Sequence, residues 1–184
     1  MRNREKIQNK SAMDSKDVVL IGMPTVGKSS MGVVLAKAMG YRFIDSDIVI
    51  QEKEGKMLNQ LIKELGTDGF LDLENEINCT ICEKRSVIAT GGSAVYGAQA
   101  MEHFKEIGTV VYLREKCEVI KERLLDPRGR GVTIREGQTI DDLFQERQSL
   151  YEKYADITVD VGGRAADDVI TEIMSEVNKI DADT

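Results

Sequence analysis

A glycine-rich segment between an apolar run and a helical pattern constrains this chain more than any other feature. Residues 18–21 (VVLI) predict a buried strand, and residues 28–39 predict a helix that ends at Gly40. Between them, residues 22–29 read GMPTVGKS, which matches the pattern G-x-x-x-x-G-K-[S/T]. In this setting, backbone N–H groups at the start of the helix point toward a bound anion. The segment therefore predicts a phosphate-binding loop for a nucleoside triphosphate.

The residues of this loop have separable predicted roles. The Lys28 ammonium should reach the β- and γ-phosphates, and the Ser29 hydroxyl should ligate Mg²⁺. The other nucleotide-binding candidates lie in or beside the same loop: Gly22, Thr25, Val26, Gly27 and Ser30. The alternative is a chance glycine-rich turn, and the order of strand, loop and helix argues against it.

Short apolar runs alternate with longer amphipathic segments along the rest of the chain. This alternation predicts βαβ units, hence an α/β fold with a mostly parallel sheet that helices cover on both faces. We expect residues 17–184 to form a single domain after a polar leader at 1–16. The predicted strands are 18–21, 41–44, 86–90, 109–113 and 157–160, and the predicted helices are 28–39, 46–54, 58–65, 67–84, 98–106, 116–125, 139–155 and 165–178.

Composition narrows the partners and the compartment. The 184 residues carry a net charge of −7, and the leader alone carries +3, which leaves −10 for the remainder. An acidic body argues against a general nucleic-acid surface. No run approaches the ~18 apolar residues that a membrane span needs. Three cysteines are an odd, sparse set typical of a reducing compartment. We expect a soluble, cytoplasmic protein that is a monomer and binds small molecules.

Two carboxylates follow the second predicted strand. Because parallel sheets bind ligands at the carboxyl ends of their strands, Asp45 and Asp47 should lie beside the phosphate loop. Asp45 could hold Mg²⁺ through water, while Asp47 could accept the proton of an acceptor hydroxyl. The alternative is that Asp47 only caps the helix that begins at Ile48.

The segment 126–137 (DPRGRGVTIREG) fits neither a strand nor a helix. It contains three glycines, one proline and three arginines. Such a segment is either a solvated loop between two helices or a mobile lid over a polyphosphate. The residues themselves leave both interpretations open.

Several motifs together resemble the shikimate kinase family. They are the phosphate loop, the D-x-D of Asp45 and Asp47, the Thr90-Gly91-Gly92 element, and R-x-x-L-Y at 147–151. The resemblance runs from about residue 17 to residue 176. It implies a three-layer P-loop kinase fold, with a five-stranded parallel sheet of order 2-3-1-4-5 and a lid. It also implies phosphoryl transfer from ATP, with Mg²⁺, to a ring hydroxyl of a small carboxylic acid, most simply shikimate.

The resemblance also assigns the acceptor side of the site. It implies that Asp47 contacts the acceptor hydroxyl and that Arg147 holds the acceptor carboxylate. Arg130 would be the lid arginine that closes on the transferred phosphate, with Arg128 as the other candidate beside the nucleotide. The catalytic set implied is thus Lys28, Asp47 and Arg130, and the pocket walls would include Gly91, Gly92 and Ser93.

The chain departs from the family pattern at two acceptor-side positions. The family has G-E-x-x-F-R-x-x-E before the third strand, whereas residues 66–74 read GTDGFLDLE, so Leu71 replaces an arginine. Ser93 replaces the third of three glycines. A leucine cannot form the charge-assisted hydrogen bonds of an arginine. A kinase for a different hydroxy acid or polyol is therefore an alternative. A nucleotide-binding regulator without transfer activity is another, although retention of Asp47, Arg130 and Arg147 argues against it.

Four other residues are assigned structural roles. Cys79 and Cys82 form an isolated C-x-x-C within a helical pattern, which favours buried helix thiols over a zinc site. Tyr151 and Tyr154 are expected to pack rather than to react.

Overall fold

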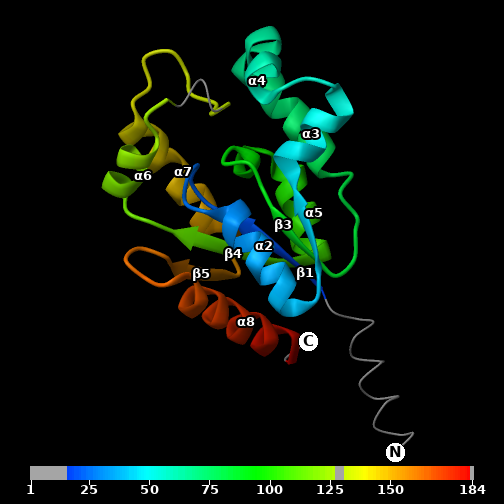
Figure 1. Ribbon diagram of the computed structural model, residues 1–184. Helices are drawn as coiled ribbons and strands as arrows, with labels where there is room; N and C mark the ends of the chain where they lie inside the picture. The colour runs from blue at the N-terminus through cyan, green and yellow to red at the C-terminus, as the bar shows by residue number, and fades with distance from the viewer. Residues whose placement is uncertain (1–15, 127–130, 183–184) are drawn as a thin grey trace, which may run out of the picture.

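Five parallel strands form one sheet at the centre of the molecule (Figure 1). The computed structural model describes residues 16–126 and 131–182. The strand order is β2-β3-β1-β4-β5, which confirms the predicted order 2-3-1-4-5. The strands are β1 (Asp17–Ile21), β2 (Arg42–Asp45), β3 (Ser86–Ala89), β4 (Gly108–Arg114) and β5 (Ile157–Asp160).

Burial of the strands explains their composition. Every residue of β1 and β3 is buried, because helices cover central parallel strands on both faces. Such strands are therefore mostly apolar along their whole length. In β5, at the edge of the sheet, buried and exposed residues alternate. The register pairs Val18 with Val87 on one side of β1 and with Thr109 on the other. This register brings the carboxyl ends of β1, β2 and β3 to one edge of the sheet.

Helices cover both faces of the sheet, as predicted. Helices α2 and α8 pack against each other and against one face, whereas α5 and α7 pack against β4 on the opposite face (Figure 1). None of the helices in the described part of the chain is long and apolar enough to cross a membrane. The helices are α2 (Lys28–Met39), α3 (Ser46–Glu54), α4 (Leu58–Asn78), the short 3-10 helix η1 (Ala94–Tyr96), α5 (Ala98–Ile107), α6 (Cys117–Arg123), α7 (Ile140–Tyr154) and α8 (Ala166–Ala182).

Helices α3 and α4 form an arm that extends beyond the carboxyl edge of the sheet (Figure 1). The arm has a small apolar core of its own, made by Ile50, Leu61, Phe70 and Ile77. Gly66 adopts φ 73° and ψ 175°, so α4 bends there into two halves. This bend agrees with the prediction of two helices that meet near residue 66.

The second half of α4 ends earlier than predicted. The helix stops at Asn78 rather than at residue 84, and the Thr80 hydroxyl donates to the carbonyl oxygen of Ile77 at 2.7 Å. The prediction of buried helix thiols is therefore wrong. Cys79 is half-buried at the helix end, and Cys82 is exposed in the following loop.

Candidate active site

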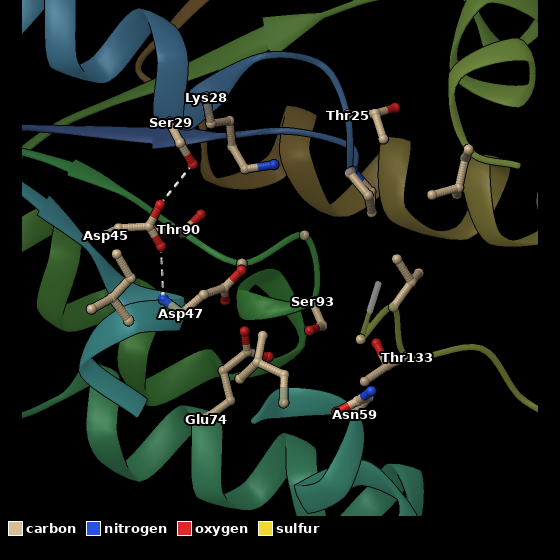
Figure 2. A pocket seen from close by; sticks show the side chains of 18 of the residues that line it. Thr25, Lys28, Ser29, Asp45, Asp47, Asn59, Glu74, Thr90, Ser93 and Thr133 are labelled. Carbon is tan, nitrogen blue, oxygen red and sulfur yellow. Dashed lines mark hydrogen bonds between the residues drawn. The ribbon is translucent and has the colours of Figure 1, made fainter. Parts of the chain in front are cut away.

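A cavity of about 1030 Å³ opens at the carboxyl ends of β1, β2 and β3, between the phosphate loop and the arm (Figure 2). Ligands of parallel α/β proteins bind at this edge of the sheet. Residues from distant parts of the sequence meet here. The lining includes Thr25, Gly27, Lys28, Ser29, Ser30, Asp45, Asp47, Asn59, Phe70, Glu74, Gly91, Gly92, Ser93, Thr133 and Arg147.

The phosphate loop has the backbone conformation that its glycines permit. Gly22 has φ 144° and Gly27 has φ 106°, values that residues with a side chain rarely adopt. A Cβ on Gly22 would also stand 2.7 Å from the carbonyl oxygen of Leu113. The remaining loop candidate, Val26, is buried beneath the loop rather than on the cavity wall. The first turn of α2, which follows the loop at the cavity wall, has no side-chain cap for its backbone N–H groups.

Lys28 curves over the loop that precedes it. Its ammonium donates to the carbonyl oxygens of Gly22 at 2.8 Å and of Met23 at 2.9 Å. Burial lowers the pKa of Lys28 to about 8, and the nearby Asp47 carboxylate partly opposes this shift. The ammonium therefore stands inside the cavity, between the loop and the acidic side of the site.

Ser29 and Asp45 form a pair of oxygen donors next to the loop. The Ser29 hydroxyl donates to Asp45 Oδ2 at 2.7 Å, and Asp45 Oδ1 accepts from the backbone N–H of Asp47 at 3.1 Å (Figure 2). Asp45 is thus the N-cap of α3, which shows that the alternative role of Asp47 as the cap is wrong. Hydroxyl and carboxylate oxygens suit Mg²⁺, which also draws ligands from water and from nucleotide phosphates.

The Asp47 side chain is free to face the cavity because Asp45 supplies the cap. Burial raises the pKa of Asp47 to about 6; the Asp45 carboxylate adds to this shift and Lys28 opposes it. The adjacent Ser46 hydroxyl accepts from the backbone N–H of Gly91 at 3.1 Å and ties the segment after β3 to α3. The backbone at Asp47 is therefore held in place, and the pKa of its carboxyl is raised to about 6.

Arg147 lies at the opposite side of the cavity and is only 1% exposed. Its Nη2 donates to the carbonyl oxygen and the hydroxyl of Thr133, at 2.8 and 2.6 Å. Its Nε donates to the Tyr96 hydroxyl at 3.4 Å. A Cβ on Gly92 would stand 3.0 Å from Nη1, so this nitrogen faces the loop after β3. The guanidinium is a buried cation held by the base of the segment 126–137.

Comparison with known proteins decides the family. The family model described as shikimate kinase matches residues 24–178, most of the chain. The chain belongs to the shikimate kinase family. This confirms the resemblance seen in the motifs.

Individual members of the family cover nearly the whole chain. Shikimate kinase from Thermodesulfovibrio yellowstonii is 36% identical over 168 residues, which are 90% of this chain and 96% of that protein. The structure of shikimate kinase from Acinetobacter baumannii in complex with shikimate has a TM-score of 0.83 at 29% identity and covers 92% of this chain and 97% of that one. The Aquifex aeolicus structure has a TM-score of 0.76 at 33% identity, covering 88% and 96%.

Leu71, which replaces the family arginine, does not line the cavity. It lies instead along a smaller hollow with Asp68, Tyr96 and Arg135. The two neighbouring residues therefore lie on different sides of α4: Phe70 lines the cavity, and Leu71 lines the smaller hollow. Leu71 thus does not stand in the acceptor pocket where the family pattern placed it, and the apolar side chain that lines the cavity from the second half of α4 is Phe70.

The predicted lid lies only partly within the described residues. Arg128 and Arg130 fall in 127–130, outside the described ranges, so their roles stay predictions. Val132 and Thr133 line the cavity, and a Cβ on Gly131 would stand 2.9 Å from the Cβ of Leu58 at the start of α4. The base of the segment thus bridges the arm and Arg147.

Two features of the cavity were not predicted from the sequence. One is the Thr133–Arg147 contact, and the other is the exposure of Asn59 and Leu58 to the cavity. No local pattern marks these residues, because they reach the site only through the bend of α4 and the path of the segment after α6. Tyr151 packs as predicted: it is buried, stacks on Tyr112, and donates to the carbonyl oxygen of Gly92 at 2.6 Å.

Proposed function

We propose that this protein transfers the γ-phosphoryl group of ATP to a hydroxyl group of shikimate. One observation carries the proposal: the phosphate loop, the half-buried Asp47 carboxyl and the buried Arg147 guanidinium line a single cavity. An acceptor with a hydroxyl near Asp47 and an acid group near Arg147 would span that cavity. The presence of shikimate in the Acinetobacter baumannii relative supports the choice of acceptor.

The nucleotide side of the site would use the loop and the start of α2. Backbone N–H groups around Gly27 would cradle the β-phosphate, and Lys28 would turn from the loop carbonyls toward the β- and γ-phosphates. Ser29 and Asp45 would hold Mg²⁺, Asp45 through water. When bound, this ion neutralises charge on the phosphate oxygens. Thr25 and Ser30 would contact the triphosphate from the loop edges.

The acceptor side would place the reacting oxygen in line with the γ-phosphorus. As the acceptor oxygen bonds to phosphorus, the bond to the β–γ bridging oxygen breaks and ADP leaves. Asp47 would take the hydroxyl proton, a task for which a pKa of about 6 is suitable near neutral pH. Gly91 and Gly92 leave room for the acceptor beside Asp47 and Arg147.

The remaining expectations complete the proposal. Arg147 would bind the acceptor carboxylate, and Arg130 would bring a lid cation to the transferred phosphoryl group, with Arg128 beside the nucleotide. We infer that the protein acts as a monomer in the cytoplasm. The three free cysteines support a reducing compartment.

A coupled assay of ADP release tests the proposal. With ATP, Mg²⁺ and shikimate we expect turnover at ordinary kinase rates of ~1–100 s⁻¹. Asp47→Asn should abolish transfer while ATP binding, measured by calorimetry, is retained. Turnover on another hydroxy acid or polyol, but not on shikimate, would refute the choice of acceptor. If no acceptor of such a panel is phosphorylated and ATP still binds, the result would favour a nucleotide-binding regulator without transfer activity.

A further inference from the structure

Glu115 is a buried carboxylate that the proposed mechanism does not use. It directly follows the last residue of β4, at the carboxyl edge of the sheet where ligands bind, and its side chain is only 2% exposed. Glutamates are almost never buried to this extent unless they are paired. The contacts of its two oxygens therefore indicate what this residue holds in place.

One oxygen of Glu115 faces the end of α6, and the other faces the loop after β5. Oε2 lies 3.6 Å from Nη2 of Arg123, the last residue of α6. Oε1 accepts from the backbone N–H of Lys116 at 2.9 Å, and a Cβ on Gly162 would stand 2.6 Å from the same oxygen. The carboxylate thus holds α6 and the loop after β5 together at the ligand edge of the sheet.

Arg123 connects this buried carboxylate to the cavity. The arginine lines the cavity together with Leu124 and Leu125, and its side chain is 48% exposed. Because side chains of a helix lean toward its amino end, Arg123 reaches back from the last turn of α6 to Glu115. The guanidinium is therefore held on one side by a buried charge, while about half of the side chain remains accessible to a ligand.

The order of the strands indicates which part of a nucleotide would meet Arg123. The phosphate loop follows the central strand β1, whereas Asp47 and Gly91 follow β2 and β3 on one side of it. Glu115 follows β4 on the other side, and α6 lies across the cavity from the α3–α4 arm (Figure 1). A triphosphate whose γ-phosphoryl group points at an acceptor beside Asp47 therefore directs its nucleoside toward β4 and α6.

We propose that Glu115 is a positioning residue of the nucleotide site, which holds the Arg123 guanidinium against the nucleoside part of ATP. Glu115 is too buried to contact the nucleotide itself and acts through the arginine. Lys28 and the phosphate loop already serve the β- and γ-phosphates, so the loss of Glu115 should affect the nucleoside and spare the phosphates. The inference rests on the ATP-binding part of the proposed function and extends it to a residue outside the phosphate loop.

The test compares the binding of ATP with that of tripolyphosphate, each with Mg²⁺, by calorimetry. Glu115→Gln preserves the shape of the side chain and an acceptor for the Lys116 N–H, but it removes the charge. We expect the Kd for ATP to rise about three- to fivefold, the effect typical of an ion pair with a solvent-exposed partner, while the Kd for tripolyphosphate stays within about 1.5-fold. Gly162→Ala, whose Cβ would press against Glu115 Oε1, should cause the same selective loss.

A double-mutant cycle determines whether Glu115 acts through Arg123. Arg123→Met removes the guanidinium and should raise the Kd for ATP at least as much as Glu115→Gln does. When Glu115→Gln is added to Arg123→Met, the Kd should rise by no more than about a further 1.5-fold. If the two substitutions instead multiply their effects independently, Glu115 does not act through the arginine and the inference is wrong.

A matched control separates this role from a general loss of charge. Glu118→Gln removes an exposed carboxylate from the same helix and should leave both Kd values unchanged. If the wild-type protein does not bind ATP, the proposed function and this inference are both wrong. If it binds ATP, but Glu115→Gln leaves or lowers the Kd for ATP, or weakens tripolyphosphate equally, the inference alone is wrong.

Discussion

The contact between Thr133 and Arg147 gives a prediction whose size follows from the structure. The Thr133 hydroxyl accepts from Arg147 Nη2 at 2.6 Å, and the guanidinium is almost fully buried. Thr133→Val removes this acceptor with little change of shape. The Thr133 carbonyl oxygen, at 2.8 Å, still accepts from the same nitrogen. We therefore expect a loss near the lower end for a hydrogen bond to a charged group, ~1.5 kcal/mol.

The loss should appear in acceptor binding if Thr133 orients the cation that binds the acceptor carboxylate. A loss of ~1.5 kcal/mol corresponds to about a tenfold increase in KM for shikimate. The KM for ATP should stay within about twofold, because the hydrogen-bond partner of Thr133 among the described residues is Arg147 and not the phosphate loop. ADP release, measured while each substrate is varied in turn, gives both values.

A matched control is Thr158→Val, which changes an exposed threonine on β5. It should leave both KM values unchanged. Urea denaturation of Thr133→Val reports how much of the loss affects the folded state itself. Destabilisation with an unchanged acceptor KM would refute the positioning role and leave Thr133 as a purely structural partner of Arg147.

Three further predictions address the metal, the pH dependence and the glycine of the acceptor wall. Ser29→Ala removes the hydroxyl that donates to Asp45. When activity is titrated with Mg²⁺, the half-saturating Mg²⁺ concentration should rise by about tenfold. An unchanged concentration would show that Ser29 is not a metal ligand. Because burial raises the pKa of Glu74 from 4.5 to about 7, the folded state holds this proton more tightly than the unfolded state, so its contribution to stability is present below pH 4.5 and is lost as pH rises to about 7. Urea denaturation between pH 4.5 and 7.5 should show a smaller fall in the free energy of unfolding for Glu74→Gln than for wild type; parallel profiles would contradict this. Gly91→Ala would place a Cβ 2.4 Å from Glu74 Oε1, so turnover should fall by at least about tenfold while calorimetry shows ATP still bound. Normal turnover would show that the Glu74 side chain can move away from the added methyl group.

The sheet and the phosphate loop were predictable from the sequence because their signals are local. Five apolar runs gave the five strands, and the loop pattern stood directly between a strand and a helix. Asp45 and Asp47 could be placed at the site because they follow a strand whose end must lie at the ligand edge. The strand order came from the family resemblance rather than from the residues alone.

Long-range contacts explain what the sequence did not reveal. The bend at Gly66 determines that Phe70 faces the cavity and Leu71 does not, and nothing within α4 indicates the direction of that turn. Asp45, and not Asp47, caps α3. This depends on the direction in which the end of β2 turns the Asp45 side chain, toward the backbone N–H of Asp47, and the sequence alone does not show that direction. The burial of Glu74 beside Gly91 depends on the loop after β3, which only the fold brings to it.

The separate apolar core of the α3–α4 arm has a consequence for how such an enzyme can change. Nucleotide-binding groups rest on the main core through β1 and α2, whereas Asp47, Phe70 and Glu74 rest on the arm. Substitutions that reshape the arm can therefore alter the choice of acceptor at little cost to the stability of the sheet. A chain built in this way can exchange one phosphorylated product for another and keep the same energy source, because part of its acceptor wall belongs to a packing unit separate from that of the phosphate loop.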